Sequence, residues 1–231
     1  KTTSRLVDKF IVVSPKSYEL RLSREKYPKE KTTVLYNSVN LKTIVSDIKF
    51  ELDKENLTIG MASRLIPLKN IQASIFMLSE LLKKGLNLKL TIAGDGPEKE
   101  NLIEYAKGLG ISEQVSFLGF VEDMQSFYNT IDIYCISSTT EDLPLSVIEA
   151  MMSGKPIIAS NIGGIPDILK DIDYSILVND FYTKEEIEKI YKMLLNCDDR
   201  NCASYLNKIA FSKFDNKAYC QKLDALYKEL L

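Results

Sequence analysis

The sequence has 231 residues, of which 45% are hydrophobic, 30 are basic and 32 are acidic. This length and apolar content can build a core without metal or disulfide support, and the balanced charge argues against a general nucleic-acid binder. Four cysteines without CxxC spacing, and no histidine, argue against a zinc site and against a histidine base. No apolar run reaches the ~20 residues of a membrane span and no secretory signal is present, so we expect a cytoplasmic protein.

Short apolar strands alternate with amphipathic helices along most of the chain. Near the start, strands are expected at 9–14 and 33–36 around a polar helix over 16–26, and an irregular polar stretch follows from Asn37 to Asn56. Beyond it the expected strands are 57–62, 88–93, 115–118, 133–137, 156–160 and 175–178. The expected helices are 71–84, 98–109, 124–130, 145–152, 184–196, 201–213 and 216–231.

This alternation predicts an α/β fold with a Rossmann-like, doubly wound parallel sheet over residues 41–214. Ligands bind such sheets beyond the carboxyl ends of the strands. The loops after Ala62, Ala93, Leu118 and Ser137 are therefore where a binding site is expected. The last helix has Tyr219, Leu223, Leu226 and Leu230 on one face and is expected to cover a surface outside this domain.

The loop after the strand at 57–62 contains Arg64 and Lys69, between a strand end and a helix start. A guanidinium and an ammonium group beside free helix amides are suited to bind a pyrophosphate. Two solvated loop cations would give the same pattern, and the spacing alone does not separate the two interpretations.

A second group begins at Glu141 and ends at Glu149, with seven residues between the two carboxylates. Glu141 lies in a loop after a strand, and Glu149 lies on the next helix. The first amides of that helix, at Leu145 and Ser146, can donate to a phosphate oxygen, and a glutamate one turn further on could accept both hydroxyls of a ribose. Taken alone, Glu149 is better explained as a complement to the helix dipole.

Six short motifs occur in one order and carry a resemblance that extends from Asp8 to Asp180. They are Asn37-Ser38-Val39-Asn40, the Arg64…Lys69 loop, Ala93-Gly94-Asp95-Gly96-Pro97, Phe117-Leu118-Gly119-Phe120-Val121, Glu141-x7-Glu149-Ala150-Met151 and Gly154-Lys155-Pro156-Ile157-Ile158-Ala159-Ser160…Gly163-Gly164. The series resembles the carboxyl-terminal, donor-binding domain of retaining GT-B glycosyltransferases, glycosyltransferase family four (glycosyl transferases group one).

The resemblance implies a role for each matching residue. Arg64 and Lys69 match the pair that holds the donor diphosphate, and Glu149 matches the glutamate that holds the ribose. Glu141 and the segment after it, with Leu143, Leu145 and Ser146, match the contacts to the transferred sugar and phosphate. Phe120 matches the loop that receives the base. Arg64, Lys69 and Glu141 are the expected catalytic residues.

The implied reaction is transfer of a hexose, with retention, from a nucleoside-diphosphate sugar (UDP or GDP) to a glycan or lipid-linked acceptor. The implied setting is bacterial-type polysaccharide or lipopolysaccharide assembly. No metal or other cofactor is expected, because fixed cations can stabilise the charge on the leaving diphosphate.

The same resemblance divides the chain. Residues 1–40 match the tail of the amino-terminal acceptor domain, 41–214 the nucleotide-sugar-binding domain, and 215–231 the helix that crosses back. We therefore expect a missing amino-terminal domain as partner, an inactive chain in its absence, and peripheral contact with the inner face of the membrane through that missing half.

Three residues depart from the family pattern. Asp142 replaces the glycine that follows the first glutamate, Ser63 replaces the glycine before Arg64, and Ser175 replaces a glycine near Asp173. The histidine that the acceptor domain contributes is also absent. Asp142 bears on how the donor sugar lies, because glycine allows the backbone to approach the sugar.

Other functions fit the sequence less well. A dehydrogenase would need a third glycine after Gly94-Asp95-Gly96, and a phosphate loop would need a glycine upstream of Gly154-Lys155. Asp171-Ile172-Asp173 has the Asp-x-Asp pattern of a metal-dependent transferase, but it follows a helix and is interpreted as a solvated turn. A nucleotide-sugar epimerase of GT-B fold, and a nucleotide-sugar-binding module without catalysis, stay open as alternatives.

Overall fold

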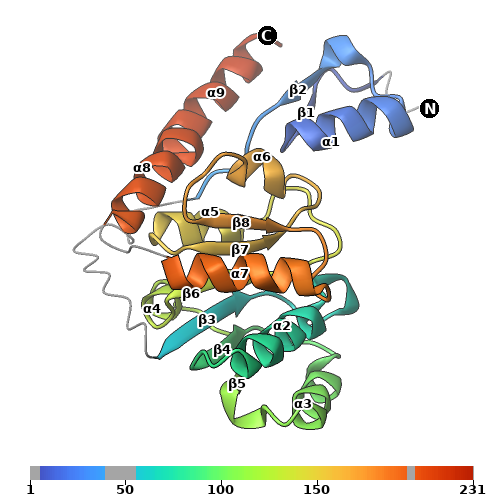
Figure 1. Cartoon of the computed structure of the whole chain (residues 1–231). Coiled ribbons are helices and arrows are strands. Elements are labelled where there is room, and N and C mark those ends of the chain that lie inside the picture. Colours follow the sequence, from blue (N-terminus) through green and yellow to red (C-terminus); the bar gives the residue numbers. More distant parts are fainter. Residues whose placement is uncertain (1–5, 40–55, 197–200, 231) are drawn as a thin grey trace.

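The computed structural model describes residues 6–39, 56–196 and 201–230. In the described part, strands β1 (Phe10–Val12) and β2 (Thr32–Val34) form a small parallel sheet joined by α1 (Pro15–Leu20). Six further strands form the main sheet. Figure 1 shows the small sheet at one end of the molecule, on the same side as the carboxyl-terminal helix.

The main sheet is parallel throughout, and its strands lie in the order β5-β4-β3-β6-β7-β8. Their bounds are β3 Leu57–Ala62, β4 Leu88–Ala93, β5 Val115–Gly119, β6 Ile133–Ile136, β7 Ile157–Ser160 and β8 Ser175–Val178. The chain builds outward from β3 to β5 and then returns to place β6 beside β3. This is the Rossmann strand order, and its switch point lies between β3 and β6.

Helices cover both faces of the main sheet (Figure 1). One face packs against α2 (Ile71–Lys83), α3 (Lys99–Gly108) and α7 (Lys184–Asn196). The other packs against α4 (Met124–Asn129), α5 (Leu145–Met152), α6 (Ile165–Leu169) and α8 (Cys202–Phe214). The predicted α/β, doubly wound fold is confirmed.

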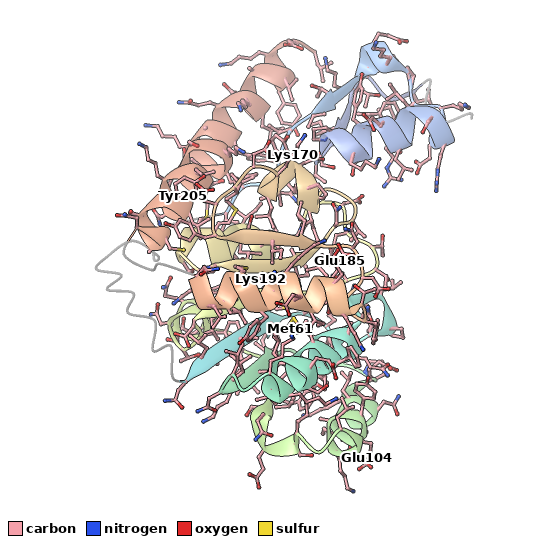
Figure 2. The ribbon with its side chains drawn as sticks, viewed as in Figure 1. Met61, Glu104, Lys170, Glu185, Lys192 and Tyr205 are labelled. Atoms are coloured by element: carbon pink, nitrogen blue, oxygen red, sulfur yellow. The ribbon has the colours of Figure 1, made fainter. Side chains whose placement is uncertain are left out.

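The core has two halves because strand side chains alternate between the faces. In β6, Ile133 and Cys135 pack on the α2 side, whereas Tyr134 and Ile136 pack on the α5 side. Figure 2 shows Met61 of β3 inside the molecule, while Glu104, Glu185 and Lys192 extend from the helices into solvent. The central strands β6 and β7 are buried at every position because helices cover both sides.

The amino-terminal unit 6–39 and helix α9 (Asn216–Lys228) lie together at one end of the main domain (Figure 1). Lys9 forms a 3.4 Å ion pair with Glu229, and Ser38 donates a 3.0 Å hydrogen bond to Asn216. Helix α9 has no buried residue. The predicted boundary at residues 40 and 41 falls outside the described residues, so the three-part division remains a prediction.

The first predicted helix, 16–26, differs from the structure. Helix α1 ends at Leu20, and Arg21–Glu25 continue as a π-helical turn that Lys26 closes with φ of 59°. The hydroxyl of Ser23 donates to the carbonyl oxygen of Glu19, 2.7 Å away, which loosens the regular helix. The remaining predicted elements have helical or strand bounds within a few residues of those observed.

Candidate functional site

The site is built on two loops that leave the carboxyl ends of β3 and β6, at the switch point. The first loop, 63–70, is braced by the turn that follows β4. The amide of Leu65 donates to the carbonyl of Asp95, 2.9 Å away, and the amide of Ser63 donates to Ala93 at 3.0 Å. A Cβ on Gly94, whose φ is 142°, would lie 1.8 Å from the carbonyl oxygen of Ser63. Glycine is therefore required for the turn to support the first loop.

Arg64 and Lys69 occupy different positions on this loop. Arg64 is exposed at the rim of a pocket, and no acidic side chain pairs with it in the described part of the chain. Lys69 ends a 3-10 turn, Pro67–Lys69, and Asn70 then begins α2 with φ of 46°. The turn directs Lys69 toward the second loop.

The second loop, 137–144, is held against the first by backbone and side-chain contacts. The amide of Thr139 donates to the carbonyl of Leu68 at 2.9 Å, and the hydroxyl of Ser137 donates to the carbonyl of Asn70 at 2.8 Å. Gly163, with φ of 55°, packs so closely that a Cβ there would lie 1.7 Å from the carbonyl oxygen of Glu141. Gly163 thus packs directly against the backbone of Glu141 and supports it.

Lys69 and Glu141 form an ion pair that joins the two loops. The ammonium group of Lys69 lies 2.5 Å from Oε1 of Glu141, and the hydroxyl of Ser138 donates to the same oxygen at 2.7 Å. The side chains are 21% and 11% exposed, so the pair is open to a ligand at one side only. Such a pair can hold Lys69 in place before an anion arrives. The sequence indicates both residues but not their contact.

Asp142, which replaces the family glycine, turns away from the Lys69 pair toward α1. Its carboxylate accepts a 2.9 Å hydrogen bond from the hydroxyl of Ser17 and lies 3.8 Å from the guanidinium of Arg21. Loop 137–144 is therefore tied to the amino-terminal unit by a side chain that glycine could not supply.

Helix α5 begins directly after this loop, with Pro144 as its N-cap residue. No acceptor for the amides of Leu145 or Ser146 is found in the described part of the chain, as expected in a first helical turn. The side chain of Leu145 is 45% exposed, whereas that of Leu143 is 5% exposed and packs in the core. Leu143 can therefore face a ligand only through its backbone.

Glu149 lies one turn into α5 and is partly buried. The hydroxyl of Tyr128, on α4, donates to Oε2 of Glu149 at 2.9 Å, and it lies 3.1 Å from the carbonyl oxygen of Ser146. Burial, together with the neighbouring Tyr134 and Glu149, raises the pKa of Tyr128 well above its usual value. The sequence gives no sign of Tyr128, because a tyrosine on a short amphipathic helix is typical of a core residue.

A pocket of about 280 Å³ opens beside Arg64, over the ends of β3, β4 and β5. Its lining is mostly apolar and backbone: Ala62, Ser63, Arg64, Ala93, Gly94, Asp95, Phe120, Val121 and Met124. Phe120 is 80% exposed at its edge. The hydroxyl of Ser63 is buried and makes no hydrogen bond with any group that the structure describes. The pocket can accept a flat apolar group that also offers a polar atom.

A larger hollow of about 630 Å³ lies between α2 and α7, lined by Phe76, Tyr182 and several charged side chains. Two of its charged residues, Lys84 and Glu188, form an ion pair at 2.7 Å. In the described ranges, no cluster of three or more histidine, cysteine, aspartate or glutamate residues could hold a metal ion. In the same ranges, none of the helices has the length and apolar character that crossing a bilayer requires.

The family model for "Glycosyl transferases group 1" matches residues 45–209. The chain belongs to this family. An uncharacterized glycosyltransferase of Haemophilus influenzae is 34% identical over 187 residues, 80% of this chain and 51% of the relative. The O-antigen biosynthesis glycosyltransferase WclY of Escherichia coli is 25% identical over 208 residues, 87% of this chain and 52% of the relative. The chain thus spans about half the length of these relatives.

Among solved structures, Anabaena HepE in complex with UDP superimposes with a TM-score of 0.85 and 22% identity, covering 98% of this chain and 65% of HepE. HepE in complex with UDP and glucose gives a TM-score of 0.83 at 23% identity, over 98% of this chain and 64% of that one. These likenesses concern the fold, which matches the carboxyl-terminal domains of GT-B glycosyltransferases.

Proposed function

We propose that the surface where loops 63–70 and 137–144 meet binds a nucleoside-diphosphate sugar. In the intact protein this donor delivers a hexose, with retention and without a metal ion, to a glycan or lipid-linked acceptor. The observation that carries the proposal is the Lys69–Glu141 pair, which lies at the switch point together with Arg64 and the first amides of α5. Ligands of doubly wound sheets bind at this point.

The cationic part of the surface where the two loops meet suits a diphosphate. Arg64 is exposed and can form two parallel hydrogen bonds, Lys69 supplies a point charge, and the α5 amides add the positive end of a helix dipole. Negative charge grows on the diphosphate as the glycosidic bond breaks. Groups already fixed in place stabilise that charge without reorganising, which replaces the role of a metal ion.

Glu141 suits contact with the sugar. Its carboxylate is fixed by Lys69 and Ser138 and retains free acceptor positions for hydroxyl groups. For retention we propose departure of the diphosphate on the face at which the acceptor enters, with the leaving phosphate taking the acceptor proton. This route needs no second carboxylate of the kind that glycosidases use.

The nucleoside then extends toward β4 and β5. The base enters the pocket beside Phe120, and Glu149 accepts the ribose hydroxyls. UDP is the proposed nucleotide because HepE, which has the same fold, was crystallised with it.

Acceptor binding is proposed for the amino-terminal part of the intact protein, on the side of α1. The hydrogen bond between Ser17 and Asp142 holds loop 137–144 against α1. WclY, named for O-antigen biosynthesis, supports an acceptor in surface polysaccharide or lipopolysaccharide assembly at the cytoplasmic face of the membrane.

Calorimetric titration of this chain with UDP, GDP and uridine tests the donor site. An Arg64→Ala/Lys69→Ala variant should lose at least about 100-fold in UDP affinity, since two contacts to charged groups contribute roughly 1.5–3 kcal/mol each. Its affinity for uridine should stay unchanged. The control is Arg24→Ala/Lys107→Ala, which makes the same charge change at two exposed residues outside the two loops. UDP binding that survives the first double change would refute the proposal.

A further inference from the structure

Tyr128 and Glu149 form a buried hydrogen bond that the proposed chemistry does not yet use. Tyr128 is 1% exposed, and its hydroxyl donates to Oε2 of Glu149 over 2.9 Å. No group in the described part of the chain donates to the other carboxylate oxygen, Oε1. One oxygen is thus anchored from within the protein, and the other is left for a ligand.

Helix α4 connects this pair to the base pocket. Met124 lines the pocket, and Tyr128 lies one helical turn later on the same face of α4. The helix is fixed at its start by Asp123, whose carboxylate accepts a 3.0 Å hydrogen bond from the amide of Ser126. A single short element therefore sets the positions of the pocket wall and of the donor to Glu149. A ribose between base and diphosphate would lie between these two points.

The ring of Tyr128 is held firmly enough to serve as an anchor. Its ring packs edge-on against that of Phe127 at 5.5 Å between ring centres, and it packs at a tilt of 55° against that of Tyr134 at 5.9 Å. Burial keeps the pKa of its hydroxyl well above the neutral range, so the hydroxyl stays protonated and can donate to Glu149. A carboxylate held by such a donor loses rotational freedom before the ligand arrives.

We propose that Tyr128 is a positioning residue for nucleotide recognition: its hydroxyl holds the carboxylate of Glu149 in the orientation that meets the ribose hydroxyls. This inference rests on the proposed role of Glu149 at the ribose. Tyr128 itself does not touch the nucleotide, so its effect on binding must pass through Glu149 and depend on the hydroxyls that Glu149 accepts.

Tyr134 supplies the matched comparison. It is also 1% exposed and stacks on Tyr128, but its hydroxyl donates to the carbonyl of Ala62 at 3.3 Å. Tyr134→Phe and Tyr128→Phe remove the same atom from the same part of the core. They differ in whether the lost hydroxyl was bonded to Glu149.

The experiment measures the affinity of the full chain for UDP and for 2′,3′-dideoxy-UDP in wild type, Tyr128→Phe, Tyr134→Phe and Glu149→Gln. If wild type binds GDP more tightly, GDP and 2′,3′-dideoxy-GDP are the pair. Folding of each variant is checked by circular dichroism at the titration temperature. Tyr128→Met, which also lacks the hydroxyl, is the second variant should the phenylalanine change impair folding.

Tyr128→Phe should lower UDP affinity by about threefold to tenfold, because the lost hydrogen bond lies within the protein and such a bond makes a net contribution of this size. The loss should vanish with the dideoxy nucleotide, and Tyr134→Phe should bind both nucleotides as wild type does. An equal loss with both nucleotides, or no loss with either, would overturn the inference alone. A wild type that binds both nucleotides equally would overturn the ribose role of Glu149, and the inference with it.

Discussion

Both edges of the main sheet carry charged residues, but these residues differ in how exposed they are. At the carboxyl edge, Arg64 is exposed and the Lys69–Glu141 pair is partly open. At the amino edge, Lys155 precedes β7 and is only 5% exposed, and Asp132 precedes β6. The carboxylate of Asp132 accepts a 2.7 Å hydrogen bond from the amide of Thr58, so it fastens β6 to β3.

The pKa of Lys155 shows that a perturbed lysine need not lie at the edge where ligands are expected. Burial lowers the pKa of Lys155 to about 8, and the nearby Asp132 opposes the shift. A strongly perturbed lysine is a common sign of a functional site. Here it marks the edge where ligands of such sheets do not bind, while accessible charges lie at the edge where they do. The proposed site therefore rests on accessibility and on the switch point, not on a perturbed pKa.

The largest effect is expected where the carboxyl edge depends on backbone contact. Gly163→Ala adds a Cβ 1.7 Å from the carbonyl of Glu141 at a left-handed φ. It should lower the free energy of unfolding by about 3 kcal/mol, because conformational strain and a backbone clash add. UDP affinity should fall as well, since Glu141 and the start of α5 must move. Denaturant unfolding and calorimetry measure the two effects.

Gly85→Ala is the control for this change. Gly85 has φ of 88°, but a Cβ there would meet nothing within 4 Å. It should cost only about 1 kcal/mol, from conformational strain alone, and should leave UDP binding unchanged. Equal losses in the two variants would show that Gly163 does not support the loop.

The amino edge is tested by the pH dependence of Lys155→Met. The folded chain has a lysine pKa of about 8 and the unfolded chain one near 10.5. Between these values the unfolded chain binds the proton that the folded chain has released, so wild type becomes more stable relative to the variant as pH rises. The difference in unfolding free energy should grow by roughly 3 kcal/mol, at about 1.4 kcal/mol per pH unit.

Below pH 8 the same difference should stay flat, because Lys155 is protonated in both states. Denaturant unfolding of both proteins from pH 7 to 10.5 measures it, and the buried tyrosines cancel in the comparison. UDP affinity at pH 7.5 should not change. A difference that stays constant across the whole range, or a loss of UDP binding, would contradict the structural role assigned to this edge.

The smallest effect concerns the outer wall of the base pocket. Phe120→Ala should reduce UDP affinity by about fivefold, the lower end of the roughly 1–3 kcal/mol that stacking of a base on an aromatic ring contributes. Stability should barely change because the ring is 80% exposed. Leu118→Ala, half-exposed on β5 two residues before Phe120 and outside the pocket lining, is the control and should bind UDP normally.

Much of the fold could be predicted because its signals are local. Strands Leu57–Ala62 and Leu88–Ala93 are short segments rich in apolar residues, and helix α5 is bounded by Pro144 and Gly154. The pattern gives no bounds for α6, because Gly163 and Gly164 before it and its own proline resemble a turn. Strand order depends on pairing between distant segments, which periodicity does not encode.

The site residues could be predicted only as separate groups. Sequence motifs mark Arg64, Lys69, Glu141 and Glu149 by type and spacing, but the Lys69–Glu141 contact spans 72 residues. The Tyr128–Glu149 bond joins two helices and resembles ordinary core packing in the sequence. That Asp142 would reach Ser17 likewise depends on how the amino-terminal unit packs against the main domain.

The most direct test is a crystal structure of this chain with UDP. The account predicts the uracil in the pocket beside Phe120, the ribose hydroxyls on Glu149, and the β-phosphate among Arg64, Lys69 and the first amides of α5. UDP in another place, such as the hollow between α2 and α7, or a diphosphate out of reach of Arg64 and Lys69, would contradict it.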